Sequence, residues 1–223
     1  MSFDGLLVTE IFHSLQGETS LSGERFSFIR LTGCNLRCAY CDTPYAFHGK
    51  NKMSISEVLS TIKSHKTRHV LVTGGEPLLQ KNTNELFNQL HQNGYQVSLE
   101  THGEVSIESV PSFVRIIMDI KTPGSQMNRG HFKKNLPFLK NTDEIKFVIT
   151  SEEDYLWAKN WITNNPVSQT CLFSPVVQSK NNWGTVQGVS ENWLAEQILK
   201  DHLNVRFQVQ LHKIIWGAET QGV

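Results

Sequence analysis

The chain has 223 residues, and its 21 Lys and Arg balance its 21 Asp and Glu, so the formal net charge is zero. This balance excludes the strongly basic surface typical of proteins that bind nucleic acid directly, and twelve Phe and five Trp exclude a disordered chain without a core. No window approaches the roughly 18 consecutive apolar residues of a membrane span, and the first five residues lack a secretory pattern. We therefore expect a cytoplasmic protein with one domain over residues 1–223.

Predicted strands alternate with predicted helices along the chain. A β-branched and aromatic run between two glycines predicts the first strand at residues 26–31. Ser54 and Glu57 form a capping box that opens an amphipathic helix. A second strand is predicted at 69–73 and a second helix at 83–93, where a glycine follows.

The same alternation continues toward the C-terminus. Further strands are predicted at 96–100, 115–119, 144–149, 170–174 and 206–211, and further helices at 152–164 and 190–202. Alternating βα units favour a mostly parallel sheet with outer helices. A complete eightfold barrel typically needs ~250 residues. We therefore predict an α/β fold, an incomplete (βα) barrel of about six to seven mostly parallel strands, with a doubly wound open sheet as the alternative.

Polar or glycine-rich segments follow several of the predicted strands. They lie at residues 33–34, 73–77, 100–103, 119–121 and 174–175. In both architectures the ligand site lies at the carboxyl ends of the strands. We therefore expect these five strand ends to converge on one pocket.

Three of the four cysteines, Cys34, Cys38 and Cys41, lie within eight positions on the loop after the first predicted strand. Soft thiolate ligands favour an iron–sulfur cluster or zinc. A structural zinc site requires a fourth ligand, for which His48 and Cys171 are the candidates, although neither shows paired spacing with the loop. The third interpretation is three buried cysteines without a metal. We favour an iron–sulfur cluster, because three thiolates leave one iron free to bind another molecule.

The cysteine loop has the spacing C-x3-C-x2-C with an aromatic residue before its last cysteine. It resembles the signature of radical S-adenosylmethionine (SAM) enzymes, and residues 74–77 (GGEP) resemble their second motif. Alone, the second motif is compatible with an ordinary turn between a strand and a helix. In that superfamily the open iron chelates the amino and carboxylate groups of SAM, and the GGEP edge contacts its methionine part.

Within this superfamily the chain resembles the 7-carboxy-7-deazaguanine synthase family of the queuosine pathway. The resemblance rests on residues 10–18, 28–34, 41–43, 72–77, 100–103, 119–123, 143–146 and 210–213. It implies a reduced radical SAM barrel that holds a 4Fe–4S cluster, SAM and Mg²⁺. The implied reaction converts 6-carboxy-5,6,7,8-tetrahydropterin to 7-carboxy-7-deazaguanine with loss of ammonia. The implied partners are the pterin substrate, an electron donor such as a flavodoxin or ferredoxin, and a second copy of the chain in a homodimer.

The resemblance also implies a set of site residues. Cys34, Cys38 and Cys41 would ligate the cluster. The SAM site would comprise Tyr40, Cys41, Asp42, Gly75, Asp119, Ile120, Lys121, Ser174, Pro175, Val176 and Val177. The substrate would contact Leu15, Gln16, Gly17, Arg30 and Thr73, and Thr43 would place its hydroxyl near Mg²⁺.

Two of these assignments have a chemical basis in the residue type. The planar guanidinium of Arg30 can recognise a carboxylate with two hydrogen bonds, although its ordinary role would be a salt bridge at the rim. The hydroxyl of Thr43 can join the oxygen shell that Mg²⁺ prefers, although a Thr before Pro44 is more often a turn residue.

The chain departs from the family pattern at two positions. Thr19 stands where Gly is common, and Thr tolerates a positive φ poorly. Ser174 stands where some relatives have Gln. No role is assigned to Glu18, His102 or His212.

Two alternatives in function remain open at this stage. One is an enzyme that activates a glycyl-radical enzyme, although such activases usually have Asn soon after the third cysteine, where this chain has Asp42 and Thr43. The other is a non-catalytic iron–sulfur carrier or zinc-stabilised binding protein, which would need a fourth protein ligand and no SAM pocket.

Overall fold

The computed structural model describes residues 5–49, 51–177, 179–181 and 184–223. Its strands are β1 (Leu6–Leu15), β2 (Arg25–Leu31), β3 (Lys52–Met53), β4 (His69–Gly74), β5 (Gln96–Thr101), β6 (Arg115–Asp119), β7 (Glu144–Ile149), β8 (Thr170–Pro175), β9 (Ser179–Asn181), β10 (Gly184–Val186) and β11 (Arg206–Phe207). Its α-helices are α1 (Ile55–Lys63), α2 (Thr83–Gln92), α3 (Glu152–Asn164), α4 (Glu191–Lys200) and α5 (Leu211–Trp216). Short 3₁₀ helices are η1 (Pro44–Phe47), η2 (Pro77–Leu79), η3 (Pro123–Ser125), η4 (His131–Lys134) and η5 (Leu136–Phe138).

Nine strands form one sheet in the order β11-β8-β7-β6-β5-β4-β2-β1-β3. The seven neighbouring strands from β2 to β11 in this order pair in parallel. Strand β1 is antiparallel to both of its neighbours, β2 and β3. The parallel strands follow their order along the chain. A doubly wound sheet would reverse that order at a switch point. The predicted α/β class and mostly parallel sheet are confirmed, and the order favours the incomplete barrel over the doubly wound alternative.

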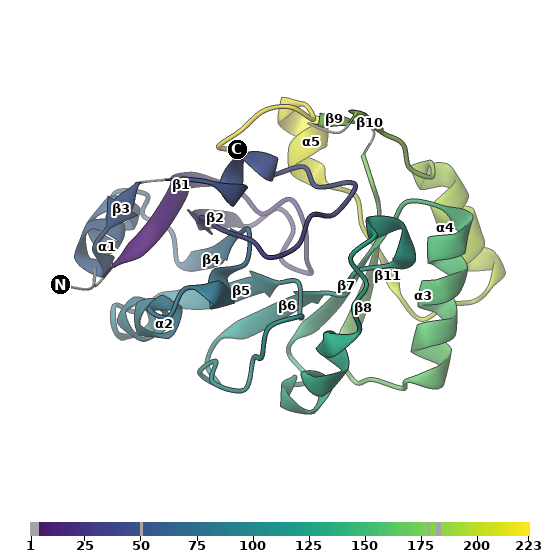
Figure 1. The fold of residues 1–223 in the computed structure, drawn as a ribbon, viewed down its shortest axis with the longest axis horizontal. Coiled ribbons are helices and arrows are strands. Elements are labelled where there is room, and N and C mark those ends of the chain that lie inside the picture. Colours follow the sequence, from purple (N-terminus) through teal and green to yellow (C-terminus); the bar gives the residue numbers. More distant parts are fainter. Residues whose placement is uncertain (1–4, 50, 178, 182–183) are drawn as a thin grey trace.

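Helices α1 to α4 cover one face of this sheet in two groups, whereas α5 lies apart from them (Figure 1). Helices α1 and α2 pack beside β1, β2, β4 and β5 through a core that includes Val58 and Leu86. Helices α3 and α4 pack beside β6, β7 and β8 through a core that includes Tyr155 and Leu194. The capping box at Ser54 and Glu57 is present at the start of α1, as predicted.

Side chains alternate between the two faces along each parallel strand. Ile29, Val72 and Phe147 point toward the helices and are fully buried. Their neighbours along the same strands point to the opposite face, where Phe28, Leu71 and other apolar side chains form a separate small cluster. The inner face therefore carries an apolar floor, and the polar residues lie nearer the carboxyl ends of the strands.

The strand prediction missed β1 and the short strands β3, β9 and β10, and it was wrong about the length of the last strand. The antiparallel β1 was not predicted, although its β-branched and aromatic composition is typical of strands. The last strand was predicted at 206–211 but covers only Arg206–Phe207. One more ladder bond follows, from Gln208 N to Phe173 O. The chain then leaves the sheet edge because Leu211 N donates to Gly17 O, and α5 begins there.

The loop after β1 turns inside the barrel. Thr19 adopts φ 67° and is buried, so the position that favours Gly carries a Thr in the left-handed region. Its hydroxyl accepts a hydrogen bond from Leu21 N at 3.1 Å. Ser20 N donates to Glu144 Oε1 at 3.0 Å. These contacts hold the strained turn in place.

No helix within the described part of the chain is long and apolar enough to cross a membrane.

Candidate active site

One cavity opens at the carboxyl ends of the parallel strands, where the sequence predicted it. Pairs of residues two positions apart line its wall, because alternate side chains of a strand face the same side. These pairs are Phe28 and Arg30, Leu71 and Thr73, Ile117 and Asp119, and Lys146 and Val148. Segments after all five predicted strand ends contribute, including Cys34, Gly75, His102, Lys121 and Pro175.

The cysteine loop forms one side of this cavity. Cys34, Cys38 and Cys41 all line it, and among the residues that the structure describes no disulfide joins any of the three. Leu36 and Tyr40 are buried on the same loop and pack with Val176 from the segment after β8. Burial raises the pKa of all three thiols. A bound metal would favour the thiolates that burial disfavours.

The described residues do not form a site for a single zinc ion. Among the described residues, no group of three His, Cys, Asp or Glu side chains converges closely enough to hold one metal ion. An iron–sulfur cluster binds each thiolate at a different iron. Cys171, a candidate fourth ligand, packs in the outer core against α3 and α4, far in the fold from the loop cluster.

The GGEP segment lies directly against the cysteine loop. Gly75 N donates to Leu31 O at 3.2 Å, and Glu76 N donates to Gly33 O at 2.7 Å. A Cβ at Gly75 would lie 2.1 Å from Gly33 O and 2.9 Å from Cys34 Cβ. Only glycine permits this approach. The ordinary-turn interpretation is therefore incomplete, because the segment extends the pairing of β2 and β4 up to the first cysteine.

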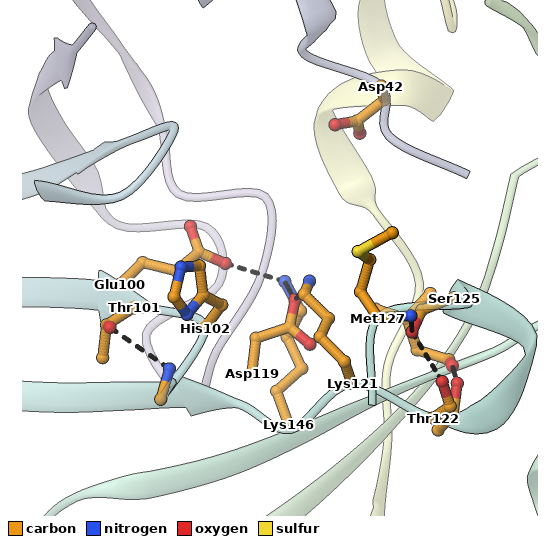
Figure 2. Close-up of polar contacts among 12 residues, drawn as sticks. Asp42, Glu100, Thr101, His102, Asp119, Lys121, Thr122, Ser125, Met127 and Lys146 are labelled. Carbon is orange, nitrogen blue, oxygen red and sulfur yellow. Dashed lines mark hydrogen bonds and ion pairs between the residues drawn. The ribbon is translucent and has the colours of Figure 1, made fainter. Parts of the chain in front are cut away.

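A buried charged network lines the cavity near the carboxyl ends of β5, β6 and β7 (Figure 2). Lys146 Nζ contacts Glu18 Oε2, and it donates to Glu100 Oε1 at 2.8 Å. Lys121 Nζ donates to Asp119 Oδ2 at 2.9 Å. Burial lowers the pKa of Lys146, but the surrounding carboxylates outweigh it and hold that pKa well above its ordinary value. Both lysines therefore remain charged inside the barrel.

Two polar atoms beside this network are buried without a hydrogen-bond partner among the described residues. They are Asp119 Oδ1 and Tyr40 Oη. A buried polar atom without a partner costs free energy. Tyr40 and Asp119 both line the cavity, and a carboxylate oxygen without a partner is a suitable acceptor for a ligand ammonium group.

The C-terminal segment closes over the cavity and contacts two of its loops. Gln210 Nε2 donates to Glu18 Oε1 at 2.7 Å, and Lys213 Nζ donates to Asp42 Oδ2 at 2.7 Å. A Cβ at Gly17 would lie 2.0 Å from His212 Nδ1, so the imidazole lies directly over that glycine. We call residues 210–213 the C-terminal strap.

The predicted substrate residues lie together on one side of the cavity. Leu15, Gln16, Gly17, Arg30 and Thr73 all line it. Arg30 Nε donates to Glu10 Oε1 at 2.6 Å across the β1–β2 pair. The predicted salt bridge is thus present, yet among the described contacts it engages only this one nitrogen of the guanidinium. Thr73 Oγ1 donates to Glu100 Oε2 at 3.0 Å.

Most of the predicted SAM and Mg²⁺ residues also line the cavity. They are Tyr40, Cys41, Asp42, Thr43, Gly75, Asp119, Lys121, Ser174, Pro175 and Val176. Ile120 and Val177 are not among the lining residues. Ile120 packs in the outer core, and its backbone N donates to Lys146 O at 2.9 Å. Thr43 precedes η1, as a turn residue would, and its hydroxyl donates to Asp42 Oδ1 at 2.8 Å.

Several lining residues were not assigned a role from the sequence. Glu18, His102 and His212 were considered without an assignment, and all three line the cavity. Lys146 and Lys213 were part of quoted motifs but were not singled out. Lys146 could have been identified from its position in a short predicted strand. It lies two residues before Val148, and both side chains point into the cavity.

Comparison with known proteins agrees with the family resemblance found in the sequence. Residues 28–130 match the family model of the radical SAM superfamily. The chain is 41% identical to a 7-carboxy-7-deazaguanine synthase from Methanospirillum hungatei over 95% of this chain and 86% of the relative. It is also 41% identical to a 7-carboxy-7-deazaguanine synthase from Koribacter versatilis, over 97% and 99% of the two chains.

This chain belongs to the 7-carboxy-7-deazaguanine synthase family. Within the radical SAM superfamily, this family assignment decides against the glycyl-radical activase. The crystal structure of QueE from Escherichia coli shares the fold with a TM-score of 0.73, at 21% identity over 94% of this chain and 97% of that chain. For a radical SAM enzyme of this family, a 4Fe–4S cluster and SAM are the implied cofactors, and the cysteine loop and GGEP segment are placed to meet them.

Proposed function

We propose that this chain converts 6-carboxy-5,6,7,8-tetrahydropterin to 7-carboxy-7-deazaguanine with loss of ammonia, in the queuosine pathway. The observation that carries the proposal is 41% identity over nearly the whole chain to relatives named for this synthase activity. The lining of the cavity supports it, because the cysteine loop, the GGEP segment and the predicted substrate residues all face one space.

Cys34, Cys38 and Cys41 would hold the 4Fe–4S cluster, and the cavity wall next to Gly75 would hold SAM. When bound, the cluster and SAM supply the one-electron chemistry that begins hydrogen abstraction. The chain contributes the close approach at Gly75 and the free acceptor at Asp119 Oδ1. Such an acceptor suits the amino group of an amino-acid ligand.

Arg30 would recognise the substrate carboxylate through the terminal nitrogens of its guanidinium, while Glu10 holds Nε and fixes the plane of the group. Thr73 is oriented by Glu100. The backbone of residues 15–17 would read the polar edge of the pterin ring. The apolar floor of Phe28, Leu71 and Ile117 would exclude water from below a reactive substrate.

The hydroxyl of Thr43 would face Mg²⁺. A hydroxyl together with a substrate carboxylate gives the oxygen ligands that Mg²⁺ prefers, with water completing the shell. Thr43 lies beside Asp42, and the Asp42 carboxylate is near enough to Arg30 for the guanidinium to help lower its pKa. Thr43 would therefore hold the ion close to the residue proposed to recognise the substrate carboxylate.

We further propose that residues 1–223 act as one domain in a cytoplasmic homodimer, reduced by a flavodoxin or ferredoxin. Light scattering during gel filtration tests the homodimer, and a monomeric mass at micromolar concentration would reject it. Reduction of the reconstituted protein by each carrier, followed by optical bleaching of the cluster, tests the electron donor.

The central experiment is anaerobic reconstitution with iron and sulfide, followed by incubation with SAM, Mg²⁺, a chemical reductant and 6-carboxy-tetrahydropterin. We expect mass spectrometry to detect 7-carboxy-7-deazaguanine. A matched Arg30→Lys variant should retain SAM cleavage and lose most product, because Lys cannot form the bidentate contact. Cleavage of SAM without any deazaguanine from the wild-type protein would reject the substrate assignment but keep the radical class.

A further inference from the structure

His102 lies at the end of β5, outside every site residue assigned so far. Its side chain lines the cavity, yet the residue is only 6% exposed. Glu104 N donates to His102 Nδ1 at 3.0 Å, so Nδ1 carries a lone pair and the ring proton resides on Nε2. His102 Nε2 lies 2.9 Å from Asn35 Oδ1. Nε2 also lies 3.2 Å from Glu76 Oε2, but the contact with Asn35 is the one with hydrogen-bond geometry, so the imidazole donates to the side chain of Asn35.

Asn35 is the residue directly after the first cysteine of the loop. Its side chain is the point at which the loop meets the end of β5. Arg129 Nη2 lies 3.5 Å from the backbone O of Asn35. The next residue, Leu36, is buried, and its N donates to Cys34 Sγ at 3.4 Å. Because Cys34 and Asn35 belong to the same backbone turn, a shift of Asn35 would also move the thiol of Cys34.

Glu76 of the GGEP segment holds the backbone of His102 in place, on the side of the contact opposite Asn35. Its side chain is fully buried. Glu76 Oε2 accepts hydrogen bonds from Thr101 Oγ1 at 2.9 Å and from His102 N at 3.0 Å, while Oε1 accepts from Leu78 N at 3.0 Å. The backbone that carries the imidazole is thus anchored to the same segment that pairs with Gly33.

We propose that His102 is a positioning residue for the cysteine loop, acting through its Nε2 hydrogen bond to Asn35, with Glu76 as its anchor. The proposal rests on the proposed function only in taking the loop as the cluster ligand. Three segments that are distant in sequence, at residues 34–41, 74–77 and 100–103, are joined by this one chain of hydrogen bonds. Its effect is to hold the Cys34 thiol in the geometry that accepts the cluster.

Two variants remove the contact from opposite sides. His102→Leu removes the donor, and Asn35→Ala removes the acceptor on an exposed position where folding is not at stake. His102→Gln keeps an amide N–H near the position of Nε2 and should rescue the contact. His131→Ala is the matched control, because His131 is a largely exposed histidine near the same loops.

The first readout is the rate of thiol alkylation of Cys34 in the cluster-free protein, followed by peptide mass spectrometry. The second is the rate at which a chelator removes iron from the reconstituted protein. We expect His102→Leu and Asn35→Ala each to raise both rates roughly five- to tenfold, the effect of losing one hydrogen bond. The double variant should be no faster than either single one. His102→Gln and the control should stay within about twofold of wild type, below the effect of one lost hydrogen bond.

An unchanged rate in Asn35→Ala, with an unchanged melting temperature, would overturn the proposal. Additive effects in the double variant would also overturn it, because they would show that the two residues act independently. The alkylation readout needs neither substrate nor cluster. If wild type makes no deazaguanine but the alkylation rates respond as expected, the proposed function fails while the positioning role stands.

Discussion

Lys213 Nζ donates to Asp42 Oδ2 at 2.7 Å, which joins the C-terminal strap to the residue after the last cysteine of the loop. The lysine side chain is 7% exposed. The strap also holds Glu18 through Gln210. One short segment therefore links the loop predicted to bind the cluster with the loop predicted to bind the substrate.

Lys213→Met should loosen both loops while leaving the sheet intact. We expect the KM for the pterin to rise about tenfold, equivalent to ~1.4 kcal/mol of lost binding, because an aligned charged hydrogen bond contributes on that scale. Steady-state kinetics with the reconstituted enzyme would measure it. Lys200→Met, an exposed change in the last turn of α4, should leave KM unchanged, and an equal rise in both variants would contradict a specific role for the strap.

Gly17→Ala should displace the strap by steric overlap. The added Cβ would lie 2.0 Å from His212 Nδ1 and 3.0 Å from the backbone N of the same residue, so a rotamer change alone cannot relieve it. We expect product formation to fall by at least about a hundredfold, as when reacting groups are misplaced by ~1 Å. Gly23→Ala is the control, because that glycine has φ 92° but open space around its Cα. It should lose about 1 kcal/mol of stability and keep its activity.

Lys146→Met should destabilise the protein by removing the cation at the centre of three buried or half-buried carboxylates. Removing one partner of a buried ion pair costs about 3–5 kcal/mol. This loss of stability should depend on pH, because Glu18 is one of the carboxylates beside Lys146. Burial raises the pKa of Glu18, but Lys146, His212 and Gln210 together outweigh burial and keep that pKa below its ordinary value. Without the lysine the buried Glu18 carboxyl would favour protonation, so the loss in the free energy of unfolding should be larger at pH 8 than at pH 5. Urea denaturation of wild type and variant at the two pH values measures this loss. An equal loss at both pH values would reject the predicted dependence on pH.

His102 should make the cluster-free protein less stable in acid. Burial lowers its pKa from 6.5 to about 3. Between these values the unfolded chain binds a proton that the folded chain excludes, so stability is lost as the pH falls from 6.5 toward 3. The slope contributed by this residue approaches ~1.4 kcal/mol per pH unit.

The His102→Gln variant tests this contribution. Its free energy of unfolding should change less steeply than that of wild type when urea denaturation is repeated over that range. Parallel curves for the two proteins would mean that His102 is not excluded from protonation in the folded state.

Much of the architecture was predictable because the strands have strong local signals. The β-branched runs at 115–119 and 144–149 match β6 and β7, and the helix predicted at 152–164 matches α3. Since parallel strands present their carboxyl ends at one edge, the convergence of five segments on one cavity followed from strand order alone.

The network around Lys146 could not be predicted in the same way. Lys146 and Glu18 are 128 residues apart, and Gln210 and Glu18 are 192 residues apart. No periodicity in the chain connects them. The predicted strand at 206–211 failed for a related reason, because hydrogen bonds to Gly17 and Glu18 draw the chain off the sheet edge after Gln208.

The turn at Thr19 has a consequence for the order in which the molecule folds. Its left-handed backbone is unfavourable by itself, and the bonds that hold it come from Glu144 and Lys146 on β7. Such distant contacts form only after the intervening chain has closed. The loop predicted to bind the substrate therefore settles late, once β7 is in the sheet, and a nascent chain acquires this predicted pterin-binding surface only after most of the barrel is complete.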